Sequence, residues 1–226
     1  MKPYYQDEQC TIYHGDCREV LPTLAAGSVD VVLTDPQYFL PPPGHNAKGD
    51  QEWVGSLGDL AMFEAAYAEV FKGLKRLTHD TGQLYLCCHD RSYPAFYRLA
   101  YCLWPKVSLI VWYKPTGRVG NGWRRSHELI LHAAGKRATY SDGFRLDVVG
   151  IMPVRTMKRS HPAEKPGELG DFLLEAVPSG VCLDPFMGSG TFLVAAKSRG
   201  MKAIGIEIEE RYCEIAVKRL AQGVLL

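Results

Sequence analysis

Two short segments of the chain combine residue types that could bind a ligand and act on it. One reads TDPQY at residues 34–38, and the other reads DPFMGSGT at residues 184–191. The second is a glycine-rich turn, whose backbone can approach a ligand closely and whose following helix offers N–H groups to a carboxylate. The first places a carboxylate, a prolyl carbonyl and an aromatic ring together, which suits a planar amine. The two segments therefore predict a cofactor site and a substrate site.

Each segment follows a short apolar run that is typical of a buried strand. Residues 29–33 read VDVVL and residues 181–183 read VCL. Runs of this kind indicate strands covered on both faces, as in parallel α/β sheets. Ligands in such sheets collect just beyond the carboxyl ends of the strands. We therefore expect both segments to face one crevice.

Strands and helices alternate along the rest of the chain. Apolar runs predict strands at 11–14, 29–33, 84–88, 107–113, 128–133, 181–183 and 203–206. Helical spacing of apolar residues predicts helices at 18–24, 60–77, 95–103, 169–177, 191–198 and 210–220. This alternation predicts an α/β fold with a mostly parallel, seven-stranded sheet and helices on both faces. A length of 226 residues fits a single domain, 1–226.

Two stretches interrupt the alternation. Residues 40–58 contain PPPG and three further glycines, and they directly follow the TDPQY segment. A loop of that length favours an active-site lid over a plain surface excursion. Residues 136–160 hold six Lys or Arg and two Asp, a balance of +4. We interpret this second stretch as a small basic target-recognition insert.

Composition excludes several classes of protein. The chain is 46% hydrophobic and 23% charged, with a net charge of +1, which is ordinary for a soluble globular protein. No apolar run is long enough to span a bilayer and the N-terminus is polar, so we expect a cytoplasmic protein. The seven cysteines form no C-x-x-C pair, which favours reduced thiols. The seven histidines show no metal-ligand spacing, so we expect no metal.

A third motif, HPAEKP at residues 161–166, joins the first two. Together they give a chain that resembles the beta-class amino-group DNA methyltransferases over about residues 11–220. In that class the catalytic motif comes first, the recognition segment second and the cofactor motif last, so the motif order is circularly permuted. The resemblance implies a Rossmann-like methyltransferase sheet, S-adenosylmethionine as cofactor with S-adenosylhomocysteine as product, and double-stranded DNA as partner. It also implies a bacterial or phage restriction–modification setting, with a homodimer as one option.

The resemblance carries cofactor roles onto individual residues. The methionine carboxylate would lie at the glycine-rich turn, Glu207 would accept from the ribose hydroxyls, and Asp16 would accept from the adenine amino group. The segment around Lys165 would close over the cofactor. Simpler readings are a solvated strand end for Glu207 and a helix cap for Asp16. The full predicted set is Asp16, Asp35, His161, Lys165, Asp184, Phe186, Gly188, Ser189, Gly190, Thr191, Glu207 and Ile208.

Catalysis is assigned to Asp35, Pro36 and Tyr38. Two acceptors, the Asp35 carboxylate and the Pro36 carbonyl, would draw an exocyclic amine towards tetrahedral geometry, while Tyr38 stacks on the flipped base. Asp at the first motif position favours adenine N6, and cytosine N4 is the alternative. A DNA-binding module that retains the cofactor but has weakened catalysis is a third reading. Phosphate contacts are predicted for Arg118, Arg124, Arg125, Arg155, Lys158 and Arg159.

Gln37 departs from the family pattern, which normally has a second proline at this position. A proline there would hold Pro36 extended and fix the direction of its carbonyl. Glutamine releases that restraint. The consequence is a mild rate penalty, a variation compensated elsewhere, or an introduced change that weakens catalysis.

Overall fold

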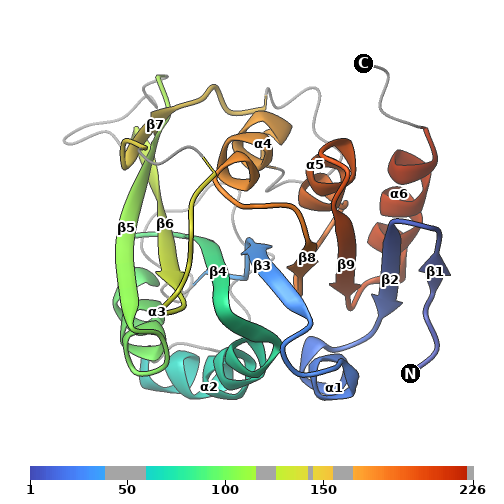
Figure 1. Ribbon diagram of the computed structural model, residues 1–226, viewed down its shortest axis with the longest axis horizontal. Helices are drawn as coiled ribbons and strands as arrows, with labels where there is room; N and C mark the ends of the chain where they lie inside the picture. The colour runs from blue at the N-terminus through green and yellow to red at the C-terminus, as the bar shows by residue number, and fades with distance from the viewer. Residues whose placement is uncertain (39–59, 116–125, 142–144, 155–164, 223–226) are drawn as a thin grey trace, which may run out of the picture.

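The computed structural model describes residues 1–38, 60–115, 126–141, 145–154 and 165–222. Its strands form one sheet in the order β1-β2-β9-β8-β3-β4-β6-β5-β7 (Figure 1). The strands are β1 (Tyr5–Gln6), β2 (Cys10–His14), β3 (Val29–Thr34), β4 (Thr78–Cys88), β5 (Lys106–Tyr113), β6 (His127–Ala134), β7 (Val148–Gly150), β8 (Val181–Asp184) and β9 (Lys202–Glu207). The helices are α1 (Cys17–Val20), the 3-10 turn η1 (Leu21–Thr23), α2 (Leu60–Leu77), α3 (Tyr93–Tyr101), α4 (Gly167–Glu175), α5 (Thr191–Ser198) and α6 (Glu210–Ala221).

The sheet confirms the predicted α/β class and corrects its strand count. All seven predicted strands are present, and β2, β9, β8, β3 and β4 run parallel. β6 runs antiparallel to both β4 and β5. The described sheet has nine strands because β1 and β7 add to its two edges. These two strands are two and three residues long, too short for an alternating pattern to show in the sequence.

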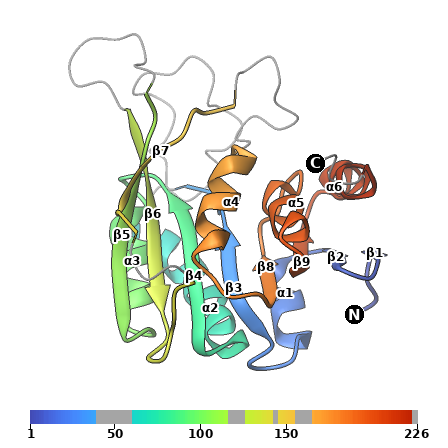
Figure 2. The same cartoon turned by 45° about the horizontal axis from the view of Figure 1, so that its top comes forward.

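Helices cover both faces of the sheet, as predicted. Buried side chains of α4, α5 and α6 pack on one face and those of α1, α2 and α3 on the other. Figure 2 shows the first group in front of the strands and the second behind them. The apolar, β-branched strands are buried because both faces are covered.

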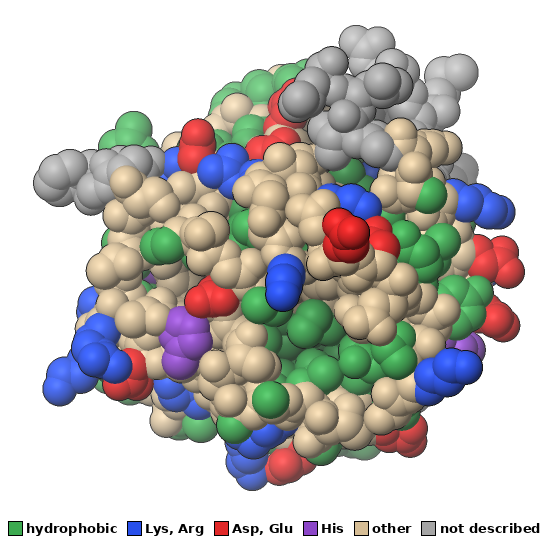
Figure 3. Space-filling model, turned by 45° about the vertical axis from the view of Figure 1, so that its right-hand side comes forward, with side chains coloured by type: hydrophobic (Ala, Val, Ile, Leu, Met, Phe, Trp, Pro, Cys, Tyr) green, Lys and Arg blue, Asp and Glu red, His purple; other side chains and the backbone are tan. Residues whose placement is uncertain are grey.

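Figure 3 shows a gathering of hydrophobic side chains on the side of the molecule that carries β1 and β2.

The strands that precede the two motifs are neighbours. β3 pairs with β8 in parallel, with Val31 opposite Cys182 and Val32 opposite Leu183. From β3 the chain continues through α2 to β4 on one side, whereas β8 continues through α5 to β9 on the other side. This reversal makes the carboxyl ends of β3 and β8 a topological switch point, where α/β sheets bind ligands. The expected common crevice is therefore supported by the strand order.

Two predicted segments are described only in part or not at all. The predicted lid at 40–58 lies outside the described residues. The predicted recognition insert, 136–160, is described at 136–141 and 145–154, and it contains β7. Within the described ranges, no helix is long and apolar enough to cross a membrane.

The turn before α5 should tolerate no side chain at Gly190. This residue has φ +80°, and a Cβ built on it would lie 2.9 Å from Ala216 Cβ on α6. Gly190→Ala should therefore lower the free energy of unfolding by about 1–3 kcal/mol, measured by urea denaturation. Gly167→Ala is the matched control, since a Cβ at Gly167 meets nothing within 4 Å. Equal stabilities of the two variants would contradict this account of the turn.

Candidate active site

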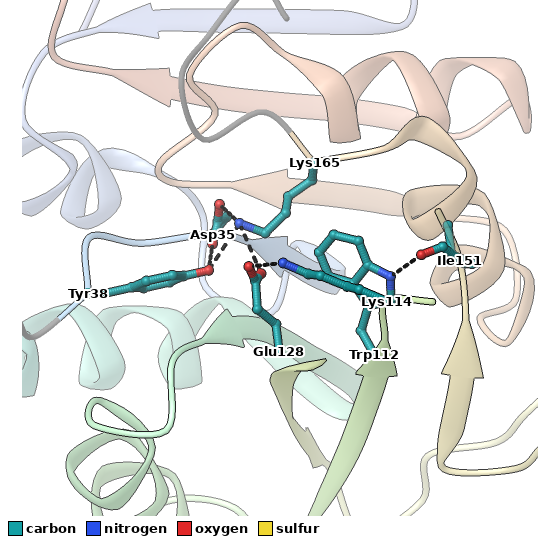
Figure 4. A network of polar contacts seen from close by, with 7 residues as sticks. All are labelled: Asp35, Tyr38, Trp112, Lys114, Glu128, Ile151 and Lys165. Atoms are coloured by element: carbon teal, nitrogen blue, oxygen red, sulfur yellow. Dashed lines mark hydrogen bonds and ion pairs between the residues drawn. The ribbon is translucent and has the colours of Figure 1, made fainter. Parts of the chain in front are cut away.

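The residues predicted to be catalytic lie at the carboxyl end of β3. The Tyr38 hydroxyl donates a hydrogen bond of 2.6 Å to Asp35 Oδ1. The Lys165 ammonium forms an ion pair with Asp35 Oδ2 and lies 3.0 Å from the Tyr38 oxygen (Figure 4). Lys165 comes from the segment just before α4, so the third motif meets the first. The structure thus places Lys165, predicted to hold the cofactor, against the catalytic carboxylate.

A second carboxylate, which the sequence analysis missed, completes this cluster. Glu128 on β6 has Oε2 3.6 Å from the Lys165 ammonium and forms an ion pair through Oε1 with Lys114, the residue after β5. Lys165 is 7% exposed and Glu128 20%, so most of this charge is shielded from water. The one acidic residue in a mostly apolar strand is the signal that could have identified it. The four groups alternate in sign across the site.

Burial and ion pairing shift the pKa of each of these groups in opposite directions. Burial raises the pKa of Asp35, and the Lys165 charge opposes that rise. Burial alone would lower the pKa of Lys165, but the Asp35 and Glu128 carboxylates raise it above its ordinary value. Burial would raise the pKa of Glu128, but Lys165 and Lys114 bring it below its ordinary value. The arrangement therefore favours a charged lysine between two carboxylates.

The middle of the catalytic segment is held from α2. The hydroxyl of Tyr67, a buried residue, donates a 3.2 Å hydrogen bond to the Gln37 carbonyl. Pro36 is buried, whereas the Gln37 side chain is exposed. The Tyr38 ring lies 6.1 Å from the His89 ring, at 30° to it. Tyr38 therefore presents its hydroxyl to Asp35 in this structure, and its stacking on a base stays a prediction.

On the cofactor side, Glu207 at the end of β9 gathers three backbone segments. Its side chain accepts hydrogen bonds from the N–H groups of Gly188, at 2.9 Å, and Glu209, at 2.8 Å. Its carbonyl accepts from the Gly15 N–H at 2.8 Å. A carboxylate offers about four lone-pair positions. Those left over suit the two hydroxyls of a ribose, so Glu207 fits its predicted role while also supporting the turn.

The glycine-rich turn has the shape that close approach of a ligand requires. Gly188 has φ +50°, and a Cβ on it would meet nothing within 4 Å, so its outer side faces open space. Arg219 on α6, another residue that the sequence analysis missed, donates to Ser189 Oγ at 2.9 Å and Thr191 Oγ1 at 3.2 Å. Ile208, the residue after β9, is 61% exposed. An apolar surface there suits a flat ring, which fits the predicted cofactor.

Asp184 and Phe186 join the turn to the catalytic strand. Thr34 on β3 donates a buried 2.7 Å hydrogen bond to Asp184 Oδ1, which also accepts from the Phe186 N–H at 3.1 Å. Asp184 is 2% exposed, and this burial raises its pKa to about 7. The side chain of Asp184 thus connects the two motifs across neighbouring strands. Its contact with a cofactor stays a prediction.

Other predicted residues are placed differently or not described. Asp16 caps α1, accepting from the Arg18 N–H at 2.8 Å and from the Arg18 guanidinium. That is the simpler reading of this residue, although the backbone next to it adjoins Glu207. His161 and the six predicted phosphate-binding cations lie outside the described residues. Across the part of the chain that is described, no group of three or more His, Cys, Asp or Glu is placed to hold a metal.

Comparison with known proteins agrees with this geometry. A family model for DNA methylases that modify N6 or N4 matches residues 29–218. The chain belongs to this DNA methylase family. It is 27% identical to the type II methyltransferase M.HinfI of Haemophilus influenzae, over 98% of this chain and 71% of that protein. It is 28% identical to the type II methyltransferase M2.DpnII of Streptococcus pneumoniae, over 97% of this chain and 92% of that protein. The methylase thus acts on an amino group of DNA, as this family does.

Solved structures share the fold. The cytosine-N4-specific PvuII DNA methyltransferase superposes with a TM-score of 0.76 at 15% identity, covering 96% of this chain and 88% of that one. M1.HpyAVI in complex with SAM superposes with a TM-score of 0.72 at 24% identity, covering 93% of this chain and 98% of that one. At these identities the likeness concerns the arrangement of the sheet and helices. It supports the Rossmann-like methyltransferase fold that the motifs predict.

Asp184 should make stability depend on pH. Its pKa is about 7 in the folded protein and 3.8 ordinarily, so the folded state binds the proton more tightly. Its contribution to stability is therefore full below about pH 4 and is lost as the pH rises through about 7. Relative to Asp184→Asn, the wild-type protein should lose ~2–4 kcal/mol of unfolding free energy between these pH values.

Urea denaturation of both proteins across this pH range measures the difference. Asp80→Asn, which removes a carboxylate whose side chain is 61% exposed, is the control for losing one acidic group. If the unfolding free energy of the wild-type protein, relative to that of Asp184→Asn, stayed constant or rose with pH, the assignment would be contradicted.

Proposed function

We propose that this methylase transfers a methyl group from S-adenosylmethionine to the exocyclic N6 amine of adenine in double-stranded DNA. The observation that carries the proposal is the adjacency of two sites. The acceptors of Asp35 and Pro36 directly follow β3, and the glycine-rich turn directly follows β8, the strand paired with β3. A substrate amine and a cofactor bound at these strand ends would lie close together. Proximity of this kind supplies a large part of a rate enhancement.

The cofactor supplies an electrophilic methyl group on a positively charged sulfur. Glu207 would accept from the ribose hydroxyls with its remaining lone pairs, and Ile208 would pack on the adenine ring. The turn at 188–191 would receive the methionine carboxylate at the start of α5. M1.HpyAVI, which shares the fold, has been solved with SAM. These assignments use the open side of Gly188 and leave the internal contacts of the turn in place.

Activation of the amine would depend on the catalytic segment. The lone pair of an exocyclic amine is conjugated into the base and is a poor nucleophile. Asp35 and the Pro36 carbonyl, each accepting one N–H, would favour a tetrahedral nitrogen. The nitrogen lone pair, freed in this way, would bond to the methyl carbon, and the electron pair of the carbon–sulfur bond would stay on sulfur. The methylated amine carries the positive charge until it releases one proton to water by way of Asp35.

Base identity rests on the first motif position. Asp35 favours adenine on the resemblance, while the PvuII enzyme, which shares the fold, is cytosine-N4-specific. The base must leave the duplex to reach Asp35, and the few kcal/mol this costs would be offset by stacking on Tyr38, worth ~1–3 kcal/mol. The basic insert at 136–160 would contact DNA around the site. A homodimer remains compatible with this arrangement.

A direct assay tests the function. The protein is incubated with S-adenosylmethionine labelled in its methyl group and unmethylated bacterial DNA, and the nucleosides are then analysed by mass spectrometry. Labelled N6-methyladenine is expected. Labelled N4-methylcytosine would replace adenine by cytosine in the proposal. Binding of cofactor and DNA without any labelled nucleoside would identify a DNA-binding module and refute the proposed activity.

Cofactor binding and catalysis should separate by mutation. Asp35→Ala should abolish methyl transfer but keep the cofactor dissociation constant within a few-fold, since Asp35 lies at the substrate side. Glu207→Ala should raise that constant about tenfold or more, because charge-assisted hydrogen bonds contribute ~1.5–3 kcal/mol. Isothermal titration calorimetry and single-turnover assays measure the two quantities. If Asp35→Ala fails to bind cofactor, this division of labour is wrong.

Restoring the family proline tests the role of Gln37. A proline at 37 would restrict the backbone of Pro36 and remove roughly 0.4–1 kcal/mol of freedom. If that entropy is the only loss, Gln37→Pro should raise the single-turnover rate no more than about five-fold, since a tenfold effect needs ~1.4 kcal/mol. A far larger gain would mean that the Pro36 carbonyl now faces away from the amine. An unchanged rate would show that the glutamine is fully compensated.

A further inference from the structure

One carboxylate oxygen in the active site has no hydrogen-bond donor among the residues that the structure describes. Glu128 Oε2 is buried and accepts no hydrogen bond from any described residue. The other oxygen, Oε1, pairs with Lys114. The Lys165 ammonium lies 3.6 Å from Oε2, outside hydrogen-bond range but within reach of a small side-chain movement. Buried polar atoms without a partner are rare in native proteins, so this oxygen calls for a physical explanation.

We propose that Glu128 is a positioning residue for methyl transfer: it takes the Lys165 ammonium from Asp35 when the base amine binds there. The inference rests on the proposed function, in which Asp35 accepts an N–H of the amine. Glu128 itself touches neither the base nor the cofactor in this account. It acts through Lys165.

The need for such a residue follows from the state of Asp35. Both of its oxygens already have a donor, Lys165 on Oδ2 and Tyr38 on Oδ1. A neighbouring positive charge weakens what a carboxylate offers to a further donor. Glu128 Oε2 gives the ammonium a second acceptor of the same charge, so Lys165 can move without becoming an unpaired buried ion. Asp35 then gains acceptor strength as the amine arrives.

The surrounding charges allow this movement. Two carboxylates and two ammonium groups alternate in the order Asp35, Lys165, Glu128, Lys114, so the set is neutral with Lys165 in either position. Lys114 lies over the Trp112 ring, 4.3 Å from its centroid. Figure 4 shows these four charged side chains, here called the array, next to one another in the site. The cost of shifting one ammonium is small because no net charge is created.

The far end of the array is anchored in the insert. Trp112 Nε1 donates a 2.8 Å hydrogen bond to the carbonyl of Ile151, just after β7. Through the Trp112 ring, Lys114 is thereby linked to the described part of residues 136–160. Other titratable groups that interact with the array come from α2, from β4 and the residue after it, from β8 and from the catalytic segment: Tyr67, Cys87, Cys88, His89, Asp184 and Tyr38. None of these carries a carboxylate beside the Lys165 ammonium as Glu128 does.

A double-mutant cycle on single-turnover methyl transfer tests the inference. Glu128→Gln keeps the size of the side chain and removes its charge. It should slow transfer by about tenfold, with the dissociation constants of cofactor and DNA changed by no more than about twofold. In a Lys165→Met background the same substitution should cost far less, because the ammonium it acts on is gone. Glu128→Asp, which restores the charge, should recover most of the rate.

The control is Glu69→Gln on α2. The Glu69 side chain is 73% exposed and pairs with Lys72 at the surface, so its substitution should leave the rate unchanged. If Glu128→Gln has no effect on the rate, or slows transfer equally with and without the lysine, Glu128 does not act through Lys165 and the inference is overturned. A rise in the DNA dissociation constant alone would also overturn it.

A second readout needs no turnover. Burial raises the pKa of Asp35, Lys165 lowers it and Glu128 raises it. Carbon-13 NMR of the Asp35 carboxyl, assigned with Asp35→Asn, should therefore show a lower pKa in Glu128→Gln and a higher one in Lys165→Met. An unchanged Asp35 pKa in a folded Glu128→Gln protein overturns the inference. Absence of methyl transfer by the wild-type protein would refute the proposed function separately, and this titration would still decide on Glu128.

Discussion

The buried ammonium of Lys165 is the constraint on which the active site depends. A charge removed from water must be paired, and removing one partner of such a pair is far more costly than the pair is worth. Lys165 satisfies this requirement with Asp35, which lies 130 residues earlier in the chain. Lys165, two residues before α4, is therefore held at the carboxyl end of β3, beside the first motif. Catalytic geometry and chain path are fixed by the same interaction.

A second buried contact holds the ends of β3 and β8 together. Thr34 and Asp184 belong to neighbouring parallel strands, and their hydrogen bond is protected from solvent. Because the two strands end together, the groups that follow them emerge at one edge of the sheet. Glu207 extends this edge by supporting Gly188 from the next strand. The polar side chains at this edge of the sheet are thus held in place by hydrogen bonds within the protein.

Elements with a long, repeated pattern could be predicted from the sequence, and isolated contacts could not. β3 and α2 follow from a β-branched run and from helical spacing over eighteen residues. β7 is too short to show a pattern and depends on pairing with β5. The ion pair of Lys165 with Asp35 could not be predicted, because the lysine's motif says nothing about which segment it will face. Glu128 was missed because only the antiparallel pairing of β6 brings it to the site.

Next to Gln37, where the family has a covalent restraint, the structure has a packing restraint. A proline at 37 would limit Pro36 through its ring, whereas Tyr67 on α2 holds the following peptide by a hydrogen bond to the Gln37 carbonyl. Tyr67 is itself fixed, since its ring packs within 4.8–5.9 Å of Phe63, Phe96 and Phe186. Phe186 belongs to the cofactor turn. The backbone of the catalytic segment is therefore restrained by an aromatic cluster that also contacts the cofactor side, which a proline alone would not provide.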